Sequence, residues 1–180
     1  MKKITLHQPK IDELWFRQEC MSDPKTMAYN AGYNVCFYGY HYDTGCIDFP
    51  KETWNSWHKE KLSDSNFFYA YILDEETKKF VGYVNFKKNP ETKKATLGIV
   101  VTSKYQGMGY MRPAMNELIK EAKVRGVEAL TDTVPVSREK ALKVFYDLGF
   151  EVVREFSGQK FNKEEKIVEI EKTLTNKLNK

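Results

Sequence analysis

The sequence predicts an α/β sandwich built around one mixed, mostly antiparallel sheet. Segments with the apolar alternation of strands occur at the start, in the middle and at the end of the 180 residues. Two amphipathic helices separate later strands, which requires crossover connections beside the antiparallel hairpins. A chain of this length is typical of one domain, so we expect a single domain over residues 1–180.

The first third of the chain is predicted to form one strand, two helices and a long loop. Residues 3–7 alternate as a strand does, and a helix carrying Leu14, Trp15 and Cys20 is expected after Asp12, closed by residues 22–24. Residues 29–49 are aromatic, glycine-punctuated and aperiodic, which indicates a long loop. Residues 51–61 carry aromatic residues at i, i+3 and predict a second helix.

The remaining residues predict a meander followed by alternating helices and strands. A charged turn at 74–79 separates two apolar segments, and Gly126 ends an amphipathic segment. The expected strands are 67–73, 80–86, 95–102, 127–134, 151–156 and 166–174, and the expected helices are 109–123 and 137–148.

Composition excludes several classes of protein. No stretch approaches the roughly 18 apolar residues of a spanning helix, and the N-terminus lacks the apolar block of a signal peptide, which favours a cytoplasmic protein without a membrane partner. Cys20, Cys36 and Cys46 show no C-x-x-C spacing and are expected to be free thiols. The histidines have no metal-ligand spacing, so no metal is expected.

The charge balance argues against a nucleic-acid partner. The 29 basic and 25 acidic residues give a formal net charge of +4, spread along the chain without a basic run interleaved with stacking aromatics. A small anionic ligand fits this balance better.

The most informative segment is 97–112, in which a buried strand enters a short glycine-containing loop that opens into a helix. Unpaired N–H groups at a helix start attract an anion, and Gly107 and Gly109 would let the backbone approach a phosphate. Pro113 is tolerated only in a first helical turn, so the helix should begin near Gly109. Alone, this pattern fits a plain strand-to-helix turn equally well; it is neither a P-loop nor a dinucleotide fingerprint.

Gln106, Gly109 and the strand ending at Val101 resemble the acetyl-CoA loop of the GCN5-related N-acetyltransferase (GNAT) superfamily, Gln/Arg-x-x-Gly-x-Gly/Ala, with Met111 at the last position. The segment 141–150, ending in Leu-Gly-Phe, is similar to the family's late helix, and residues 168–174 to its final strand. The resemblance covers roughly residues 67–174 and implies a sheet splayed between its fourth and fifth strands.

The resemblance also implies a binding mode for acetyl-CoA as co-substrate. Backbone groups of Ile99, Val100 and Val101 would hold the pantetheine arm, and Arg138 is a candidate for phosphate charge, although a solvated surface arginine is the plainer interpretation. The N–H groups expected at the pyrophosphate are those of Gln106, Gly107, Met108, Gly109, Tyr110, Met111 and Arg112.

Transfer of an acetyl group to an amine requires a proton acceptor and help for the departing thiolate. Thr96 stands where the family often has a glutamate, so Asp132 is the candidate base, with a turn-capping role as the alternative. Tyr146 can donate a proton to the thiolate, whereas Phe145, in the position of the family tyrosine, cannot. Adjacent helical residues are about 100° apart, so only one of the two should face the cleft.

The acceptor pocket is expected in the aromatic first third, where rings would either line the pocket or pack the core. The candidate residues are Tyr29, Asn30, Tyr33, Tyr40, His41 and Trp54. The sequence thus predicts an acetyl-CoA-dependent N-acetyltransferase acting on a small-molecule or peptide amine by direct attack in a ternary complex. The alternative is a non-catalytic acyl-CoA-binding regulatory module; a homodimer is compatible with either.

Overall fold

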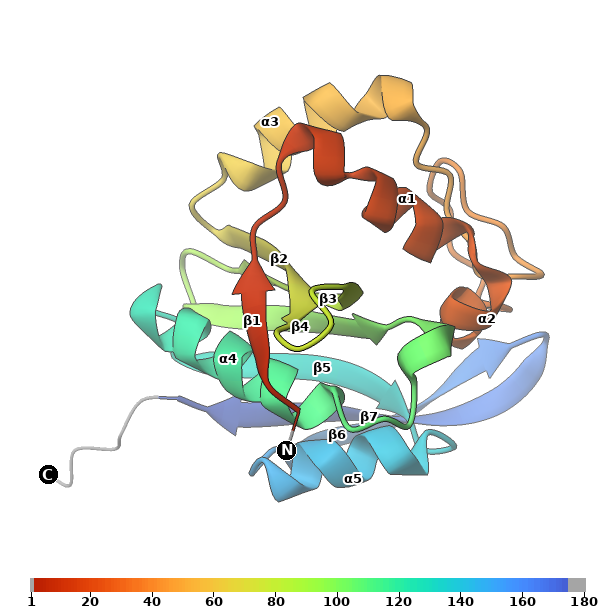
Figure 1. Cartoon of the computed structure of the whole chain (residues 1–180). Helices are drawn as coiled ribbons and strands as arrows, with labels where there is room; N and C mark the ends of the chain where they lie inside the picture. Colours follow the sequence, from red (N-terminus) through yellow and green to blue (C-terminus); the bar gives the residue numbers. More distant parts are fainter. Residues whose placement is uncertain (1, 175–180) are drawn as a thin grey trace, which may run out of the picture.

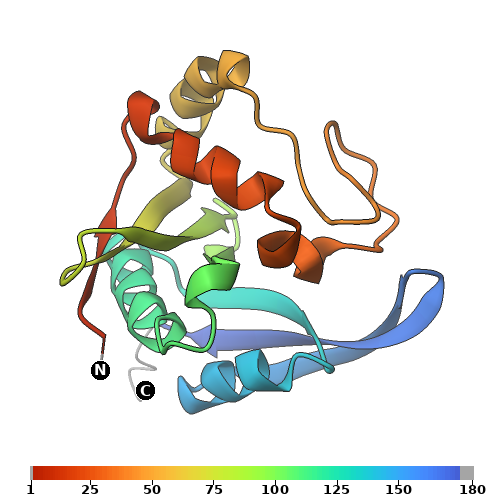
Figure 2. The same ribbon diagram turned by 45° about the vertical axis from the view of Figure 1, so that its right-hand side comes forward.

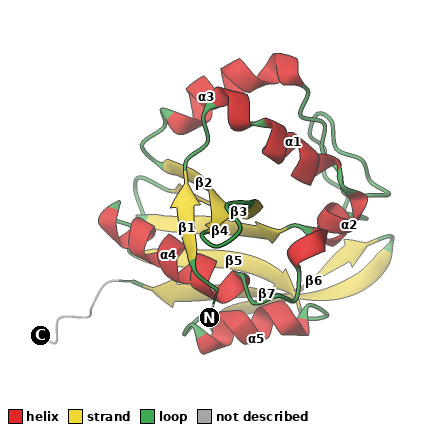
Figure 3. Ribbon diagram, in the orientation of Figure 1, coloured by secondary structure: helices red, strands yellow, loops and turns green. Residues whose placement is uncertain are grey.

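The computed structural model describes residues 2–174 and contains one seven-stranded sheet with the strand order β1-β2-β3-β4-β5-β7-β6 (Figures 1 and 3). All neighbouring strands are antiparallel except β4 and β5, which are parallel. The strands are β1 (Ile4–His7), β2 (Phe67–Asp74), β3 (Phe80–Lys88), β4 (Lys94–Val101), β5 (Ala129–Pro135), β6 (Glu151–Lys160) and β7 (Lys163–Thr173).

Helices cover both faces of this sheet, as Figure 1 shows. On one face lie α1 (Trp15–Ser22), α2 (Pro24–Met27) and α3 (Trp54–Leu62), and on the other lie α4 (Met111–Val124) and α5 (Glu139–Asp147). The predicted α/β sandwich with a mixed, mostly antiparallel sheet is therefore confirmed.

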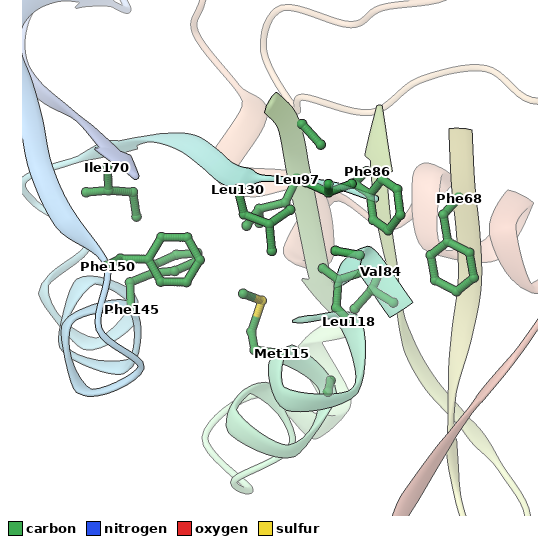
Figure 4. Close-up of a cluster of buried hydrophobic side chains, with 14 of the residues drawn as sticks. Phe68, Val84, Phe86, Leu97, Met115, Leu118, Leu130, Phe145, Phe150 and Ile170 are labelled. Carbon is green, nitrogen blue, oxygen red and sulfur yellow. The ribbon is translucent and has the colours of Figure 1, made fainter. Parts of the chain in front are cut away.

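Two apolar layers fill the sandwich because successive strand residues point to opposite faces. Phe68, Ala70 and Ile72 of β2 join Met115 and Leu118 of α4 in the larger core, part of which is drawn in Figure 4. Tyr69 and Tyr71, which alternate with them, face α1 and α3 in a second, strongly aromatic cluster with Phe16 and Tyr83. The larger core joins the sheet to α4 and α5, the helices that border the site described below.

The sheet opens between β4 and β5, as the family resemblance implies. Their parallel pairing spans three residue pairs only, from Lys94–Ala129 to Thr96–Thr131. Beyond Thr96, β4 continues along β3 to Val101, while β5 continues along β7 to Pro135. Since each strand keeps its other partner, the gap between them is part of the fold.

The structure differs from the predicted elements in two places. The first helix, α1, ends at Ser22 as expected, but residues 24–27 form a further short helix, α2, because Asp23 caps it and Pro24 occupies its first turn. The last hairpin is longer than expected: β6 extends to Lys160 and β7 begins at Lys163, around a turn with positive φ at both central residues. Figure 2 shows this hairpin extending beyond the body of the sheet.

The three cysteines are free thiols, as predicted. Burial raises the pKa of the Cys20 thiol to about 12, so this residue stays a neutral thiol. Within residues 2–174, no helix is long and apolar enough to cross a bilayer.

Candidate active site

A pocket of about 590 Å³ lies where β4 and β5 diverge, bordered by α2, the loop after β4, the start of α4, and α5. This volume is in the range of small-molecule sites. Nine of the eleven residues predicted to bind acetyl-CoA line it, namely Ile99, Val101, Gln106, Gly107, Gly109, Tyr110, Met111, Arg112 and Arg138.

The loop between β4 and α4 is shaped for close approach of a ligand. Gly107 and Gly109 have φ values of +76° and +84°, and within residues 2–174 no heavy atom beyond the glycine and its two chain neighbours lies within 4 Å of where a side chain would begin. The first turn of α4, which starts at Met111, contains no acidic residue and no side-chain cap. Its first N–H groups and partial positive charge are therefore available to an anion.

Hydrogen bonds within the loop reduce the number of amides left for a ligand. The Gln106 amide donates to Thr102 O (3.1 Å) and the Met108 amide to Tyr105 O (3.3 Å). The Met108 side chain does not line the pocket and is 54% exposed. Contrary to the expectation for these two residues, their N–H groups are already bonded. The amides that remain are those of Gly107, Gly109, Tyr110, Met111 and Arg112.

Backbone groups of β4 also face the opening. The Asn89 amide donates to Lys94 O (2.8 Å) and the Thr102 amide to Val81 O (3.0 Å), just before and just after the β3–β4 ladder. Because hydrogen-bonded pairs alternate in antiparallel sheets, Val100 directs its polar groups to β3, and Ile99 and Val101 direct theirs toward β5. Val100 instead packs in the aromatic cluster on the other face, so its placement differs from the expected one.

A clamp of hydrogen bonds joins α2 to the loop after β4. The Asp23 carboxylate accepts hydrogen bonds from the Thr26 hydroxyl (2.5 Å) and the Ser103 hydroxyl (2.8 Å), as well as from two amides of α2. The Ser103 amide donates to Thr26 Oγ1 at 2.8 Å. The pKa of Asp23 is lowered because these hydrogen bonds outweigh its partial desolvation. One wall of the pocket is thereby fixed to the loop.

Positive charge surrounds the pocket. Lys25, Arg138 and Lys140 line it together with Arg112, whose guanidinium forms a 2.5 Å ion pair with Asp147. The Arg138 guanidinium lies 5.3 Å from the centre of the Tyr29 ring and pairs with no carboxylate of residues 2–174. Arg138 thus lines the pocket beside Tyr29, close enough to Asp132 for its charge to act on that carboxyl.

The Asp132 carboxyl lines the same pocket, on β5 just past the point where the strands separate. Burial raises its pKa to about 7, although a hydrogen bond from the Thr133 amide (2.8 Å) and the nearby Arg138 charge act in the opposite direction. A carboxyl group with this pKa exchanges protons at neutral pH, which suits a general base.

On α5, the structure places Phe145 at the pocket and Tyr146 away from it. Phe145 is 2% exposed, lines the pocket and packs on Phe150. Tyr146 is 45% exposed and does not line the pocket. Only one of the two faces the cleft, as helical geometry requires, and it is the residue without a hydroxyl.

Of the six predicted acceptor residues, only Tyr29 lines this pocket. Asn30 and Tyr40 are hydrogen-bonded within the loop 28–47, and Tyr33 donates to Glu165 Oε2 in the final hairpin (2.5 Å). His41 pairs with Asp48 at 2.9 Å at a different pocket, and Trp54, the first residue of α3, is buried against Leu14, Met21 and Phe49. These five residues stabilise the irregular loop and its packing.

The sequence analysis missed several residues of the lining. Lys25 and Thr26 come from α2 and Ala28 directly follows it, and the Asp-Pro pair at 23–24 was a readable helix-start signal for that segment. Lys140, Ala141 and Val144 belong to the predicted helix 137–148, but no sequence feature indicates which of its faces meets the gap.

Comparisons with known proteins agree with this geometry. A sequence profile of the acetyltransferase (GNAT) family matches residues 31–150. The spermidine N-acetyltransferase of Vibrio cholerae in complex with CoA and spermine superposes with a TM-score of 0.78 and 15% identity, over 98% of each chain. A candidate acetyltransferase of Salmonella typhimurium with its cofactor acetyl-CoA gives a TM-score of 0.73 and 15% identity, over 99% of this chain and 98% of that one. At such identities the likeness shows the fold. No match is found among curated protein sequences.

Proposed function

The chain belongs to the acetyltransferase (GNAT) family, whose enzymes use acetyl-CoA as co-substrate, and we propose that it acetylates the primary amine of a small molecule or peptide by direct attack in a ternary complex. The observation that carries this proposal is that one pocket combines groups suited to an anion with a carboxyl group suited to proton transfer. Unbonded amides lie at the start of α4, cations from α2 and α5 line the same pocket, and a carboxyl group with a pKa of about 7 lies at the β4–β5 opening.

The residues present fit acetyl-CoA. The diphosphate would lie at the amides of Gly107, Gly109 and the first turn of α4, where open space replaces side chains. Arg138 and the lysines of the lining would balance its negative charge. The backbone of Ile99 and Val101 would hydrogen-bond the pantetheine amides as an added strand does.

When bound, acetyl-CoA supplies a thioester whose carbonyl carbon forms the new C–N bond as its C–S bond breaks. An alkyl ammonium with a pKa of about 10 must first lose a proton, and Asp132, ionised above pH 7, would accept it directly or through one water. A thiol has an ordinary pKa of about 8.5, so the thiolate is a tolerable leaving group near neutrality. No hydroxyl on the pocket face of α5 is needed for this scheme.

The alternative, an acyl-CoA-binding module without catalysis, predicts the same anion cradle. It gives no role to a carboxyl group with a raised pKa beside the opening. Asp132 therefore favours the enzyme.

The experiment combines CoA binding by calorimetry with thiol release from acetyl-CoA over a panel of primary amines. Gly109→Asp adds a carboxylate to the cradle, and we expect it to weaken CoA binding at least about 100-fold. Gly126→Asp is the matched control, since Gly126 also has a positive φ (+70°) and open space but follows the far end of α4. It should leave CoA affinity unchanged.

Two results would contradict the proposal. Absence of CoA binding by the intact protein would remove the cradle altogether. Tight CoA binding without thiol release on any amine would support the regulatory module instead.

A further inference from the structure

The aromatic cluster on the α1–α3 face encloses a guanidinium. The Arg17 side chain, from α1, lies 4.5 Å from the centre of the Trp57 ring, 4.9 Å from Phe49, 5.1 Å from Tyr69 and 5.9 Å from Tyr83. These rings come from α3, the segment before it, and strands β2 and β3. Arg17 itself is only partly buried, whereas Tyr69 and Tyr83 are buried, so part of the arginine stays accessible.

This guanidinium has no anionic partner in the part of the chain that the structure describes. Three of the five arginines pair with carboxylates, namely Arg112 with Asp147, Arg125 with Glu121 and Arg154 with Glu169. The two others are Arg138, which lines the pocket, and Arg17. Arg17 Nε and the Tyr69 hydroxyl are both buried; the two side chains interact with each other, and neither of these atoms has a well-aligned hydrogen bond within residues 2–174.

Aromatic rings satisfy only part of what a guanidinium requires. A ring attracts the cation through its face, whereas the five N–H groups of arginine point outward in the plane of the guanidinium and need acceptors. A buried charge without such acceptors is unfavourable, and a planar carboxylate is the group that matches the fork best. Because part of Arg17 is accessible and no carboxylate of residues 2–174 pairs with it, its guanidinium fork is open to the carboxylate of a ligand.

Tyr29 connects this cluster to the pocket. Its ring packs against the aromatic cluster, and the same residue lines the β4–β5 pocket. Tyr83, which contacts Arg17, pairs with Val100 on β4, next to the backbone that faces the opening. Burial raises the pKa of the Tyr29 hydroxyl, and both the Arg17 and Asp132 charges act on it. The hydroxyl therefore lies within electrostatic range of the guanidinium and of the candidate base.

We propose that Arg17 binds a carboxylate of the acceptor, so that the substrate class is a primary amine that also carries a carboxylate, such as an α-amino acid. This inference rests on the proposed function, because it places the acceptor amine between Arg17 and Asp132. A polyamine brings only positive charge to this cluster and is disfavoured by it.

The test uses matched pairs of amines that differ by the carboxylate alone, α-amino acids and their decarboxylated amines, for example phenylalanine and 2-phenylethylamine. Spermidine is included as a polycation. Thiol release is measured for each with the intact protein, and binding of each to the CoA-saturated protein is measured by calorimetry. For at least one pair, we expect kcat/KM and affinity to favour the carboxylate-bearing member by about 10-fold to 100-fold.

Two variants separate recognition from folding. Arg17→Met keeps an apolar stem among the rings and should abolish the preference within the pair while CoA affinity stays unchanged. Arg154→Met is the control, because Arg154 also lies over an aromatic ring (4.7 Å from the centre of Phe156) but is on the exposed strand β6. It should retain the preference, and thermal unfolding verifies that both variants fold.

The outcomes distinguish this inference from the proposed function. Turnover of decarboxylated amines or spermidine at rates equal to or above those of the amino acids would overturn the role of Arg17 and leave the acetyltransferase proposal intact. Selective binding of carboxylate-bearing amines without turnover would support Arg17 and contradict the proposed catalysis. A preference that survives Arg17→Met would also overturn the inference.

Discussion

Replacing Asp132 with asparagine is expected to stabilise the folded protein at alkaline pH. Burial raises the pKa of this carboxyl from 3.8 to about 7, so the folded state holds a proton that the unfolded state has lost. Stability conferred by that proton is complete below pH 3.8 and disappears as the pH rises to 7. At 1.36 kcal/mol per pH unit, the loss amounts to about 4 kcal/mol. Asparagine keeps the shape of the side chain and does not titrate.

The same substitution should lower activity. General-base catalysis contributes about 10²-fold to 10⁴-fold, so kcat of Asp132→Asn should fall by that range. In the wild type, kcat/KM should rise with pH until Asp132 is ionised near pH 7. Acceptor deprotonation also raises the rate with pH, and the profile of the variant isolates that contribution. The difference between the two pH profiles is the part of the pH dependence that ionisation of Asp132 causes.

The assay is urea unfolding of both proteins at pH 5 and pH 8, together with pH–rate profiles. Between these pH values, the stability of Asp132→Asn relative to the wild type should increase by about 3 kcal/mol. Glu155→Gln, an exposed carboxyl on β6, is the control and should show no such increase. An unchanged stability difference from pH 5 to pH 8 would refute the buried, raised-pKa carboxyl on which the proposed base depends.

Three further predictions concern the walls of the pocket. Tyr146→Phe should leave kcat unchanged, because the Tyr146 side chain does not line the pocket. Phe145→Ala should lower the free energy of unfolding by about 3–5 kcal/mol in urea, because Phe145 is buried. A large loss of kcat in Tyr146→Phe would show that α5 presents its other face to the pocket. Asp23→Ala removes a helix cap worth about 1 kcal/mol, so the melting temperature should fall by about 2–4 °C. The KM for acetyl-CoA should rise, because the substitution also removes the hydrogen bond from Ser103 in the loop after β4. An unaltered KM would mean that the clamp does not position the loop. The buried Tyr110 hydroxyl donates to Asp74 and holds the pKa of that carboxyl at about 2, so its stabilising effect is present above pH 3.8 and lost as the pH falls toward 2. Tyr110→Phe should therefore shift acid unfolding to higher pH, and identical acid titrations of variant and wild type would contradict this assignment.

Much of the fold was predictable because the residue patterns that specify strands and helices lie within short stretches of sequence. The nearly continuous apolar run of β2 is typical of a strand buried on both faces, and the 3.6-residue period of α4 records its buried face; Pro113 located the start of that helix to within two residues. The short helix α2 was missed because the Asp-Pro pair at its start also fits a helix end. The length of the final hairpin was underestimated because residues 157–162 are polar or glycine except for Phe161, and β6 has mostly exposed side chains.

The candidate site was predictable where it consists of backbone and not where it consists of side chains. The strand–glycine loop–helix order is local, so the residues of the β4–α4 loop could be named from sequence. Which residues of the aromatic loop 29–49 line the pocket could not be named, because tertiary contacts decide it; Tyr40, for example, donates a hydrogen bond to Asn30 O within the loop. Burial of Asp132 likewise depends on strands and helices distant in the sequence.

By itself, the amino-acid order determined the succession of strands and helices, the mixed sheet, and the loop whose glycines leave amides free for an anion. Those properties follow from short-range sterics and from the spacing of apolar residues. Only the tertiary structure decided that Phe145 rather than Tyr146 meets the pocket, that Asp132 is desolvated enough to titrate near neutrality, and that Arg17 lies among four rings with no carboxylate partner in the described part of the chain. Each of these depends on how segments far apart in the chain exclude water from one another, which no local pattern records.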